Sequence, residues 1–350
     1  MKTIEERKAR WLGLYEPGVD SKFVYVIGCS EPEEGIEVPG RPPLWPQFRD
    51  ERIEWAWKRY EAAVSRAKWL DDDAVPFLSV TSGTEIFAEA FGARVHRPDD
   101  NMPFAIPFIM SPEQAEKIKV PRLEDTPLTR LLDIADELTR RSGGEAPLQL
   151  PDMQSPMDVV AQLWDKTDLF PSMIEAPETV KELSEKIRTL QYAFLDEWFS
   201  RYGIDYIAHF PEYFMRGGIT MSVDEIGSVS PEMYDIFFRD ELNDMSRRYG
   251  GIGIHSCSDS KHQWGNLIKT EGLKMLNLYR PEPVLNESYR FFKDAAAMWP
   301  GNLVNNIGAA LTRRPKKSYP RGCRIVLTEH APTKEWAKRL AADMREEYGE

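Results

Sequence analysis

Several features are scarce in this sequence of 350 residues, and each scarcity excludes a class of protein. Its three cysteines are too few for a disulfide framework, so they are available for metal binding or catalysis in a reducing compartment. No apolar run approaches the roughly 18 residues that cross a bilayer, and the charged start of the chain lacks the apolar stretch of a signal peptide. We therefore expect a cytoplasmic protein without a membrane segment.

Positive charge is also in deficit, because 45 Lys plus Arg residues oppose 57 Asp plus Glu residues and give a net charge of −12. This sign disfavours general electrostatic binding to nucleic acid or to anionic lipid. The strings typical of P-loop enzymes, serine esterases and zinc proteases are missing. The 42% hydrophobic and 29% charged residues that are present are typical of a folded globular protein.

Proline and glycine divide the chain into alternating helices and strands. Ser or Thr followed by Pro, as at 111–112, 155–156 and 230–231, predicts helix starts, and Gly143-Gly144 predicts a helix end. Short β-rich runs alternate with these helices. They are FVYVIG from Phe23, PFLSV from Pro76, PLQL from Pro147, IDYIAHF from Ile204, GIGIH from Gly251, LKMLNL from Leu273, NLVNN from Asn302 and RIVLT from Arg324.

Eight strands alternating with helices predict parallel βαβ units and hence an α/β fold, a TIM (β/α)8 barrel. A long aromatic helix before them suggests an N-terminal helical extension over residues 1–72, packed on a barrel of residues 73–350. We expect its aromatic residues to cover the barrel or a dimer contact.

The segment GGIGIHSCSD is the most informative short stretch. His255 and Cys257 lie two residues apart at the predicted C-terminal end of a strand, so they point to the same side. Imidazole nitrogen and thiolate sulfur suit zinc, and catalytic zinc sites keep three protein ligands and one open position. The pair therefore predicts a metal site that needs a third ligand.

Three residues near the last strand are candidates for that ligand. Cys323 precedes the strand, whereas Glu329 and His330 follow it. At about 3.3 Å per residue, roughly 20 Å separate Cys323 from His330, so only one of them can lie at the mouth with His255. We favour His330, with Glu329 as the alternative, and interpret Cys323 as a buried structural thiol.

Other polar or aromatic residues follow predicted strands, at the end where TIM barrels bind their ligands. Two acids are candidates for catalytic roles, Asp224 and Glu85. The candidates for binding a substrate or cofactor are Asp152, Gln154, His209, Tyr213 and Trp264.

Four segments together resemble the uroporphyrinogen decarboxylase superfamily, in particular its branch of cobalamin-dependent, zinc-binding methyltransferases. They are GTEIFAEAFG from Gly83, DMQSPMDVVAQLWDKTDLFPSMIEAPETVKEL from Asp152, VDEIGSVSPEMYDIFF from Val223 and GIGIHSCSDSKHQW from Gly251. The resemblance covers most of the chain from about Asp73 onward and implies a TIM barrel.

The methyltransferase branch holds zinc with a His-x-Cys pair, which His255 and Cys257 match, and with a later cysteine. This sequence has Thr328-Glu329-His330 where that cysteine would stand, so either His330 substitutes for it or the metal site is altered. The resemblance implies transfer of a methyl group between a corrinoid and a small thiol or other small substrate. The corrinoid would arrive on a separate carrier protein, since no D-x-H-x-x-G cobalamin signature is present; a homodimer is also common in this fold family.

Two alternatives stay open at this stage. The first is a metal-independent decarboxylase or lyase, which would need an arginine cluster near the barrel mouth. The F-R-Q-A-G-R-Y segment that grips substrate propionates in the true decarboxylase is missing here. The second is a non-catalytic barrel that binds a tetrapyrrole.

Overall fold

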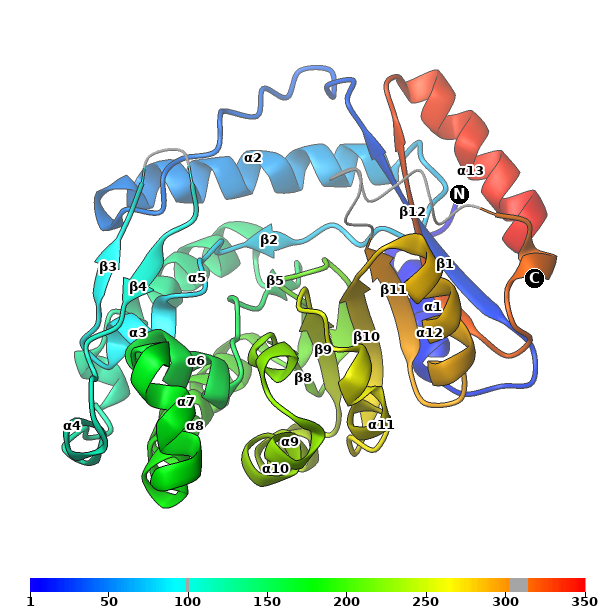
Figure 1. Ribbon diagram of the computed structural model, residues 1–350. Helices are drawn as coiled ribbons and strands as arrows, with labels where there is room; N and C mark the ends of the chain where they lie inside the picture. The colour runs from blue at the N-terminus through cyan, green and yellow to red at the C-terminus, as the bar shows by residue number, and fades with distance from the viewer. Residues whose placement is uncertain (99–100, 302–313, 350) are drawn as a thin grey trace.

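The computed structural model describes residues 1–98, 101–301 and 314–349, and these fold as a TIM (β/α)8 barrel (Figure 1). The barrel strands are β1 (Lys22–Cys29), β2 (Leu78–Ser79), β5 (Leu148–Gln149), β8 (Ile219–Ser222), β9 (Ile252–Ser256), β10 (Leu273–Tyr279), β11 (Ala297–Gly301) and β12 (Arg324–Ala331). Two antiparallel additions are β3 (Arg94–His96) with β4 (Phe104–Ile106), and β6 (Asp205–Ile207) with β7 (Phe214–Arg216).

The strands form two parallel sets that meet at the chain segment after β5. One set runs in the order β1-β12-β11-β10-β9-β8, and the other contains β2, β5 and the β6–β7 hairpin. Gln154 pairs with Ser222 in a parallel bridge, and the Ser155 amide donates to the Ser222 carbonyl oxygen over 2.8 Å. The end of the β5 segment therefore lies directly beside β8.

Carboxylates join the remaining edges, β1 and the segment before β2. The amides of Tyr25 and Ile27 on β1 donate to the side chains of Asp73 and Asp72, over 2.9 and 3.0 Å. Arg7, fully buried, pairs with Asp72 over 2.6 Å and also donates to the Leu70 carbonyl oxygen. At this closure, hydrogen bonds from side chains replace the main-chain hydrogen bonds that join neighbouring strands elsewhere in the barrel.

Thirteen helices surround and cap the described strands. They are α1 (Ile4–Tyr15), α2 (Arg49–Ala67), α3 (Ile86–Ala90), α4 (Pro112–Glu116), α5 (Thr129–Ser142), α6 (Pro156–Leu163), α7 (Lys166–Glu175), α8 (Pro177–Tyr202), α9 (Pro231–Phe237), α10 (Arg239–Tyr249), α11 (Trp264–Leu267), α12 (Glu282–Phe292) and α13 (Lys334–Tyr348). Figure 1 shows α13 on the outer side of β1 and β12. The predicted Ser-Pro starts are confirmed for α4, α6 and α9, and Gly143 ends α5 in a left-handed conformation.

Helix α1 closes the barrel at the amino ends of the strands. A capping box at Thr3 and Glu6 starts it. Its Trp11 stacks on Trp299 of β11, with ring centroids 5.8 Å apart, and Arg324 at the start of β12 donates to the Tyr15 carbonyl oxygen over 2.6 Å. The opposite, carboxyl end of the barrel is the end available for ligands.

The predicted strands agree with the structure except at two places. IDYIAHF contributes β6 of the added hairpin, whereas the fourth barrel strand is β8, in the run GITMS, which is absent from the eight predicted strands. The run NLVNN falls outside the described residues, and the seventh strand is β11, directly before it. Period-two patterning does not distinguish this hairpin from β8, because all three runs are short and mainly apolar.

The expected division at residue 72 does not coincide with a break in the sheet. β1 lies before that point and pairs with β12 along eight residues, and α2 links β1 to β2 as a barrel helix does. Of the proposed extension, α1 alone lies outside the βα repeat.

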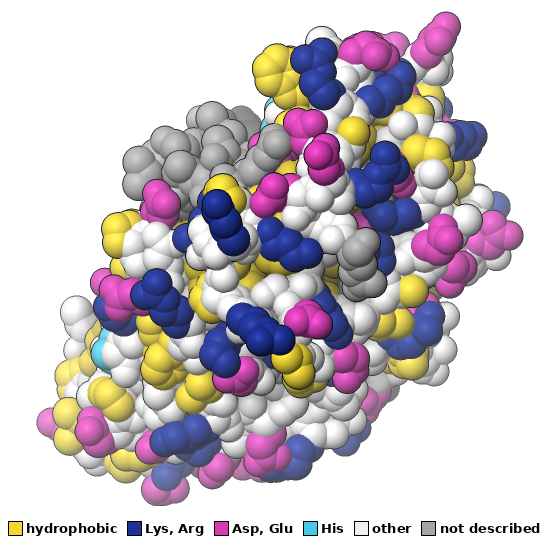
Figure 2. Space-filling model, turned by 90° about the vertical axis from the view of Figure 1, so that its right-hand side faces the viewer, with side chains coloured by type: hydrophobic (Ala, Val, Ile, Leu, Met, Phe, Trp, Pro, Cys, Tyr) yellow, Lys and Arg dark blue, Asp and Glu magenta, His cyan; other side chains and the backbone are white. Residues whose placement is uncertain are grey.

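No helix in the described parts of the chain combines the length and apolar character that a membrane span requires. Figure 2 shows acidic and basic side chains interspersed on one face of the molecule, where the described residues cover it. This mixture gives that face no extended area of positive charge for a polyanion.

Buried Glu241 on α10 makes stability pH-dependent. It accepts a hydrogen bond from Ser184 of α8 over 2.6 Å, and burial raises its pKa to about 8. Between about pH 4.5 and 8 the folded state keeps a proton that the unfolded state has lost, so stability falls as pH rises through this window. We expect Glu241→Gln to raise the free energy of unfolding at pH 8 by roughly 1–4 kcal/mol.

Urea unfolding at pH 5 and pH 8 checks this prediction. The gain of Glu241→Gln should shrink towards pH 5, and Glu185→Gln, an exposed acid on α8, should change neither value. An equal effect of Glu241→Gln at both pH values would contradict the prediction.

Candidate functional site

Three side chains that can ligate a metal meet at the carboxyl ends of two neighbouring strands. Asp224 follows β8, His255 is the fourth residue of β9, and Cys257 comes directly after β9. One ligand atom from each lies within 4.8 Å of the others, and this is the one such cluster of three found among the described residues. The predicted His-x-Cys pair is thus at the barrel mouth, together with an acid from the adjacent strand.

A hydrogen bond fixes which nitrogen His255 presents. Its Nδ1 lies 2.5 Å from the Oδ1 atom of Asn277 on β10, in register with His255. The Nδ2 group of Asn277 donates to the Trp299 carbonyl oxygen over 2.5 Å, so the amide oxygen must be the atom that faces the imidazole. Nδ1 therefore carries a proton, and Nε2 keeps the lone pair that a metal needs.

Asp224 is held by main-chain and side-chain contacts. Its Oδ1 accepts the Cys257 amide over 2.6 Å, which ties the β8 loop to the β9 loop. Its own amide and that of Glu225 donate to Asp158 on α6, over 3.0 and 2.7 Å. Burial raises the pKa of Asp158 to about 8, with the Asp224 charge as a further cause. The acid is thus positioned by a turn that α6 stabilises.

The Cys257 thiol lies in an environment that disfavours its ionised form. Partial burial raises its pKa to about 12, and the Asp224 carboxylate adds to this effect. Arg280 donates to the Cys257 carbonyl oxygen and lowers the pKa only weakly. A thiol in this setting is a poor nucleophile by itself, whereas a cation in the cluster would favour the thiolate.

A second group of polar residues lies beside the cluster. Gln154 donates to Asp152 over 2.7 Å, and His209 Nε2 lies 3.6 Å from the other carboxylate oxygen of Asp152. Ser222, which precedes Asp224 by two residues, lies in register with His255 and 3.4 Å from Asp152. The structure therefore brings three sequence-predicted residues, Asp152, Gln154 and His209, together next to the cluster.

The ring of Phe210 packs edge-on against His255, with centroids 4.8 Å apart. Since Phe210 follows His209, the β6–β7 hairpin covers this side of the site. His209 Nδ1 is buried and has no hydrogen-bond partner in the described part of the chain. This nitrogen is therefore an unsatisfied polar atom beside the site.

His330 is not part of the cluster, contrary to our expectation for the third ligand. Its Nε2 lies 2.7 Å from the Ser30 hydroxyl, and Gly28 on β1 leaves room for the ring. Two strands, β11 and β10, separate β12 from β9, which corresponds to roughly 14 Å across the sheet. Asp224 takes the place in the cluster that the sequence analysis gave to His330.

The other two candidates from the last strand also lie elsewhere. Glu329 precedes His330 on the same strand β12, and Cys323 is buried before that strand with its sulfur 3.6 Å from the Ser21 hydroxyl. The argument that Cys323 and the mouth lie at opposite ends of β12 agrees with this placement.

Two predicted binding residues lie outside the mouth. Tyr213 is buried beneath it, where its ring packs on Trp11 and its hydroxyl occupies the space that a side chain at Gly253 would fill. Trp264 packs in the helical layer against Phe292 of α12. A position directly after a predicted strand does not distinguish residues that pack in the core from residues that bind a ligand. The loops leave the barrel at different distances from the strand ends.

Glu85 lines a pocket formed by the loop after β2 and by α2, α3 and α5. Burial raises its pKa to about 7, and its Oε2 atom has no hydrogen-bond partner among the described residues. The same pocket contains Arg52 and Arg97, which the sequence analysis did not identify. A polar side chain inside an apolar strand signals a site residue, as Asn277 in LKMLNL does, but these arginines carried no such signal.

The donor set of the cluster fits zinc. One imidazole nitrogen, one sulfur and one carboxylate oxygen are the ligand types that Zn²⁺ accepts, and three protein ligands leave a fourth position open. Calcium and magnesium prefer oxygen ligands throughout.

Removal of the Asn277 side chain tests the orientation of His255. We expect Asn277→Ala to weaken zinc binding by roughly 10–100-fold, because the imidazole loses the partner that fixes its tautomer. Competition with a chromophoric chelator measures this affinity. Unchanged affinity in a normally folded variant would mean that another group orients His255.

Three comparisons relate the chain to known proteins. The family described as "Uroporphyrinogen decarboxylase (URO-D)" matches residues 67–291. A solved methyltransferase from Methanosarcina mazei is 14% identical, with a TM-score of 0.63 over 98% of this chain and 99% of that one. The Bacillus subtilis mannanase BCman is 10% identical, with a TM-score of 0.37 over 99% of this chain and 91% of its own.

No curated protein matches the sequence. The methyltransferase likeness shows the fold, at an identity too low to transfer an activity, and the mannanase likeness is too weak to support an argument. The family match covers more than half of the chain and includes β8, β9 and the whole cluster. The chain belongs to the uroporphyrinogen decarboxylase family.

Proposed function

We propose that this protein is a zinc-dependent methyltransferase-like enzyme that moves a methyl group between a corrinoid and a small thiol or other small substrate. The observation that carries the proposal is the cluster of Asp224, His255 and Cys257 at the barrel mouth. Membership of the family and the fold shared with a methyltransferase support it.

His255, Cys257 and Asp224 would hold the zinc ion through nitrogen, sulfur and oxygen. When bound, zinc supplies a Lewis acid that favours the thiolate of a substrate thiol over the thiol. The chain's own contribution is to orient the ligands through Asn277, the Cys257 amide and Asp158.

The polar group beside the cluster is suited to bind the substrate and to accept its proton. The Asp152 carboxylate lies 3.6 Å from His209 Nε2, and we propose that the unpartnered Nδ1 of His209 takes the proton of a substrate thiol. Gln154 holds Asp152 in place over 2.7 Å. The Phe210 ring limits the access of water from the side of the hairpin.

A larger cavity lies beside the closure of the barrel. A cavity of about 520 Å³ borders β1, α2 and the segment before β2. Its walls include Val26, Trp55 and Phe77, with Arg59 and Glu212 at its rim. We propose that a corrinoid carried by a partner protein approaches the carboxyl end of the barrel, and that the enzyme works in the cytoplasm, where its free cysteines stay reduced.

Methyl transfer from methylcobalamin to a panel of small thiols tests the function. Zinc-loaded protein should demethylate the corrinoid, seen as a change in its visible spectrum, and the thioether product should appear by mass spectrometry. We expect Cys257→Ser to lower the rate by more than about a hundredfold, because it removes several kcal/mol of charge stabilisation. Cys323→Ser, which alters a buried thiol before β12, should keep the activity.

A second candidate is decarboxylation of a carboxylated substrate without a metal. The observation that favours it is the pocket that contains Arg52 and Arg97 beside the mouth. Release of carbon dioxide from uroporphyrinogen by zinc-free protein would support it. Tight binding of a corrinoid or tetrapyrrole without methyl transfer or decarboxylation would instead indicate a non-catalytic barrel.

A further inference from the structure

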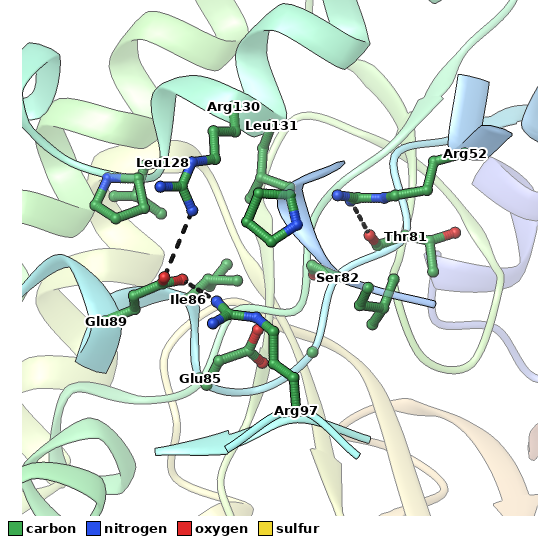
Figure 3. A pocket seen from close by; sticks show the side chains of 14 residues that line it. Arg52, Thr81, Ser82, Glu85, Ile86, Glu89, Arg97, Leu128, Arg130 and Leu131 are labelled. Carbon is green, nitrogen blue, oxygen red and sulfur yellow. Dashed lines mark hydrogen bonds and ion pairs between the residues drawn. The ribbon is translucent and has the colours of Figure 1, made fainter. Parts of the chain in front are cut away.

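A polar pocket distinct from the metal cluster lies between α2, α3, the end of β3 and the start of α5 (Figure 3). Arg52, Arg97 and Glu85 point into it from three different elements. Leu128 and Leu131 line it on the side of α5. The pocket therefore combines charged groups with an apolar wall.

Each of three charged side chains in this pocket has one buried polar atom without a hydrogen-bond partner among the described residues. The Nε atoms of Arg52 and Arg97 and the Oε2 atom of Glu85 are buried without a hydrogen bond in the described part of the chain. Arg52 is 8% exposed and Glu85 is 4% exposed. Unsatisfied buried donors and acceptors are costly, so three of them around one pocket make it a candidate site for a polar ligand.

The remaining contacts hold the arginines in place. Arg52 donates through Nη2 to the carbonyl oxygens of Val80 and Thr81, over 2.9 and 2.7 Å, which leaves Nε and Nη1 for a ligand. Arg97 donates through Nη2 to Glu89 over 2.6 Å. Both guanidinium groups are thus fixed before a ligand binds, which reduces the entropy lost on binding.

The balance of charge favours an anion. Arg52, Arg97 and Arg130 face two acids, Glu85 and Glu89, and Glu89 is engaged by Arg97 and, over 3.5 Å, by Arg130. Arg52 forms no ion pair within 4 Å of a carboxylate among the described residues, although Glu85 acts on it at longer range, and half of the Glu85 side chains are neutral near pH 7. The pocket is left with an excess positive charge.

The pocket is connected to the mouth through Ser82. Ser82 lines the pocket, and its hydroxyl accepts the amide of Asp152 over 2.8 Å. The charge of Asp152 in turn affects the pKa of Glu85. A small molecule anchored in the pocket would therefore extend towards the group of Asp152, Gln154 and His209.

We propose that this pocket binds the carboxylate of a small substrate with a short apolar chain, through Arg52 and Arg97, and that protonated Glu85 donates a hydrogen bond to it. The inference rests on the proposed function in that the anchored molecule is the small methyl donor or acceptor. A carboxylate fits better than a phosphate dianion, because a single excess charge and a leucine-lined wall suit a monoanion with an alkyl chain.

Binding should become weaker as pH rises through neutrality. Glu85 faces Arg97 after β3, Glu89 on α3, Asp152 after β5 and Arg52 on α2, and burial is the largest cause of its raised pKa. With that pKa at about 7, roughly one molecule in ten carries the proton at pH 8, so affinity should fall about tenfold between pH 6 and pH 8.

Titration of metal-free protein with butyrate, followed by ligand-detected NMR, tests the site. We expect saturable binding at pH 6 that weakens about tenfold at pH 8, whereas Glu85→Gln should bind equally at both pH values because its amide stays neutral. Arg97→Gln should weaken binding by roughly 10–100-fold, as expected for loss of a charged donor. Arg94→Gln, which alters an exposed arginine on β3, the strand that Arg97 follows, should leave the affinity unchanged.

Other outcomes would overturn the inference. They are the absence of saturable binding to the wild-type protein, tighter binding of inorganic phosphate than of butyrate, or unchanged affinity in a folded Arg97→Gln variant. Cys257→Ser should bind butyrate like the wild type. Loss of methyl transfer with butyrate binding retained would therefore count against the proposed function alone.

Discussion

Replacing His255 with Ala should abolish stable zinc binding. The side chain supplies one of three donors, and structural zinc sites gain about 10–16 kcal/mol in total, so its loss should cost roughly 3–5 kcal/mol, or more than a hundredfold in affinity. Metal analysis of protein purified without a histidine tag should find about one zinc per wild-type chain and well below 0.1 per variant chain, as expected from that loss.

Two further variants distinguish the ligand sets. Asp224→Ala should lose zinc as His255→Ala does, because its carboxylate lies in the cluster. His330→Ala should keep zinc, since this imidazole contacts Ser30 and lies on β12, three strands away from β9. The reverse pattern, with zinc lost from His330→Ala and kept by Asp224→Ala, would restore the ligand set expected from the sequence.

Replacing Arg7 with Ala should produce the largest loss of stability. Arg7 and Asp72 are each 1% exposed, and the Asp72 carboxylate accepts a hydrogen bond from the Ile27 amide of β1. Removal of the arginine leaves a buried carboxylate without its cation at the place where the barrel closes, which should cost about 3–5 kcal/mol. Urea unfolding should show the midpoint falling accordingly.

A matched exposed pair serves as the control. Arg49 of α2 pairs with Asp133 of α5 at the surface, with side chains 40% and 56% exposed. Arg49→Ala should cost less than about 1 kcal/mol. Equal losses from Arg7→Ala and Arg49→Ala would mean that the carboxylate closure does not hold the barrel together.

The barrel could be predicted because strand and helix patterns alternate along the chain. Most of the strands could be located from residues that are close together in the sequence. The sequence also predicted that His255 and Cys257 lie together at a strand end, because side chains two residues apart in a strand point to the same face of the sheet. Both inferences need only neighbours in sequence. The prediction placed a barrel strand at β6 instead of β8. Three short, mainly apolar runs follow one another there, and only their pairing in the folded structure distinguishes them.

The third ligand depended on strand order, which local patterns do not show. Consecutive βα units place β8 next to β9, so an acid after the preceding strand is nearer to His255 than any residue of β12. Asp224 was identified as a candidate acid, but residue type favoured His330. Arg52 and Arg97 were missed because they reach the pocket from α2 and from a hairpin far apart in sequence.

X-ray absorption at the zinc edge tests the central claim most directly, because it reads the atoms bound to the metal. Zinc-loaded wild-type protein should show one sulfur at about 2.3 Å with nitrogen and oxygen at about 2.0–2.2 Å. The sulfur contribution should vanish in Cys257→Ser and persist in Cys323→Ser. A first shell without sulfur, or one that Cys257→Ser leaves unchanged, would contradict the proposed metal site and the methyl transfer that depends on it.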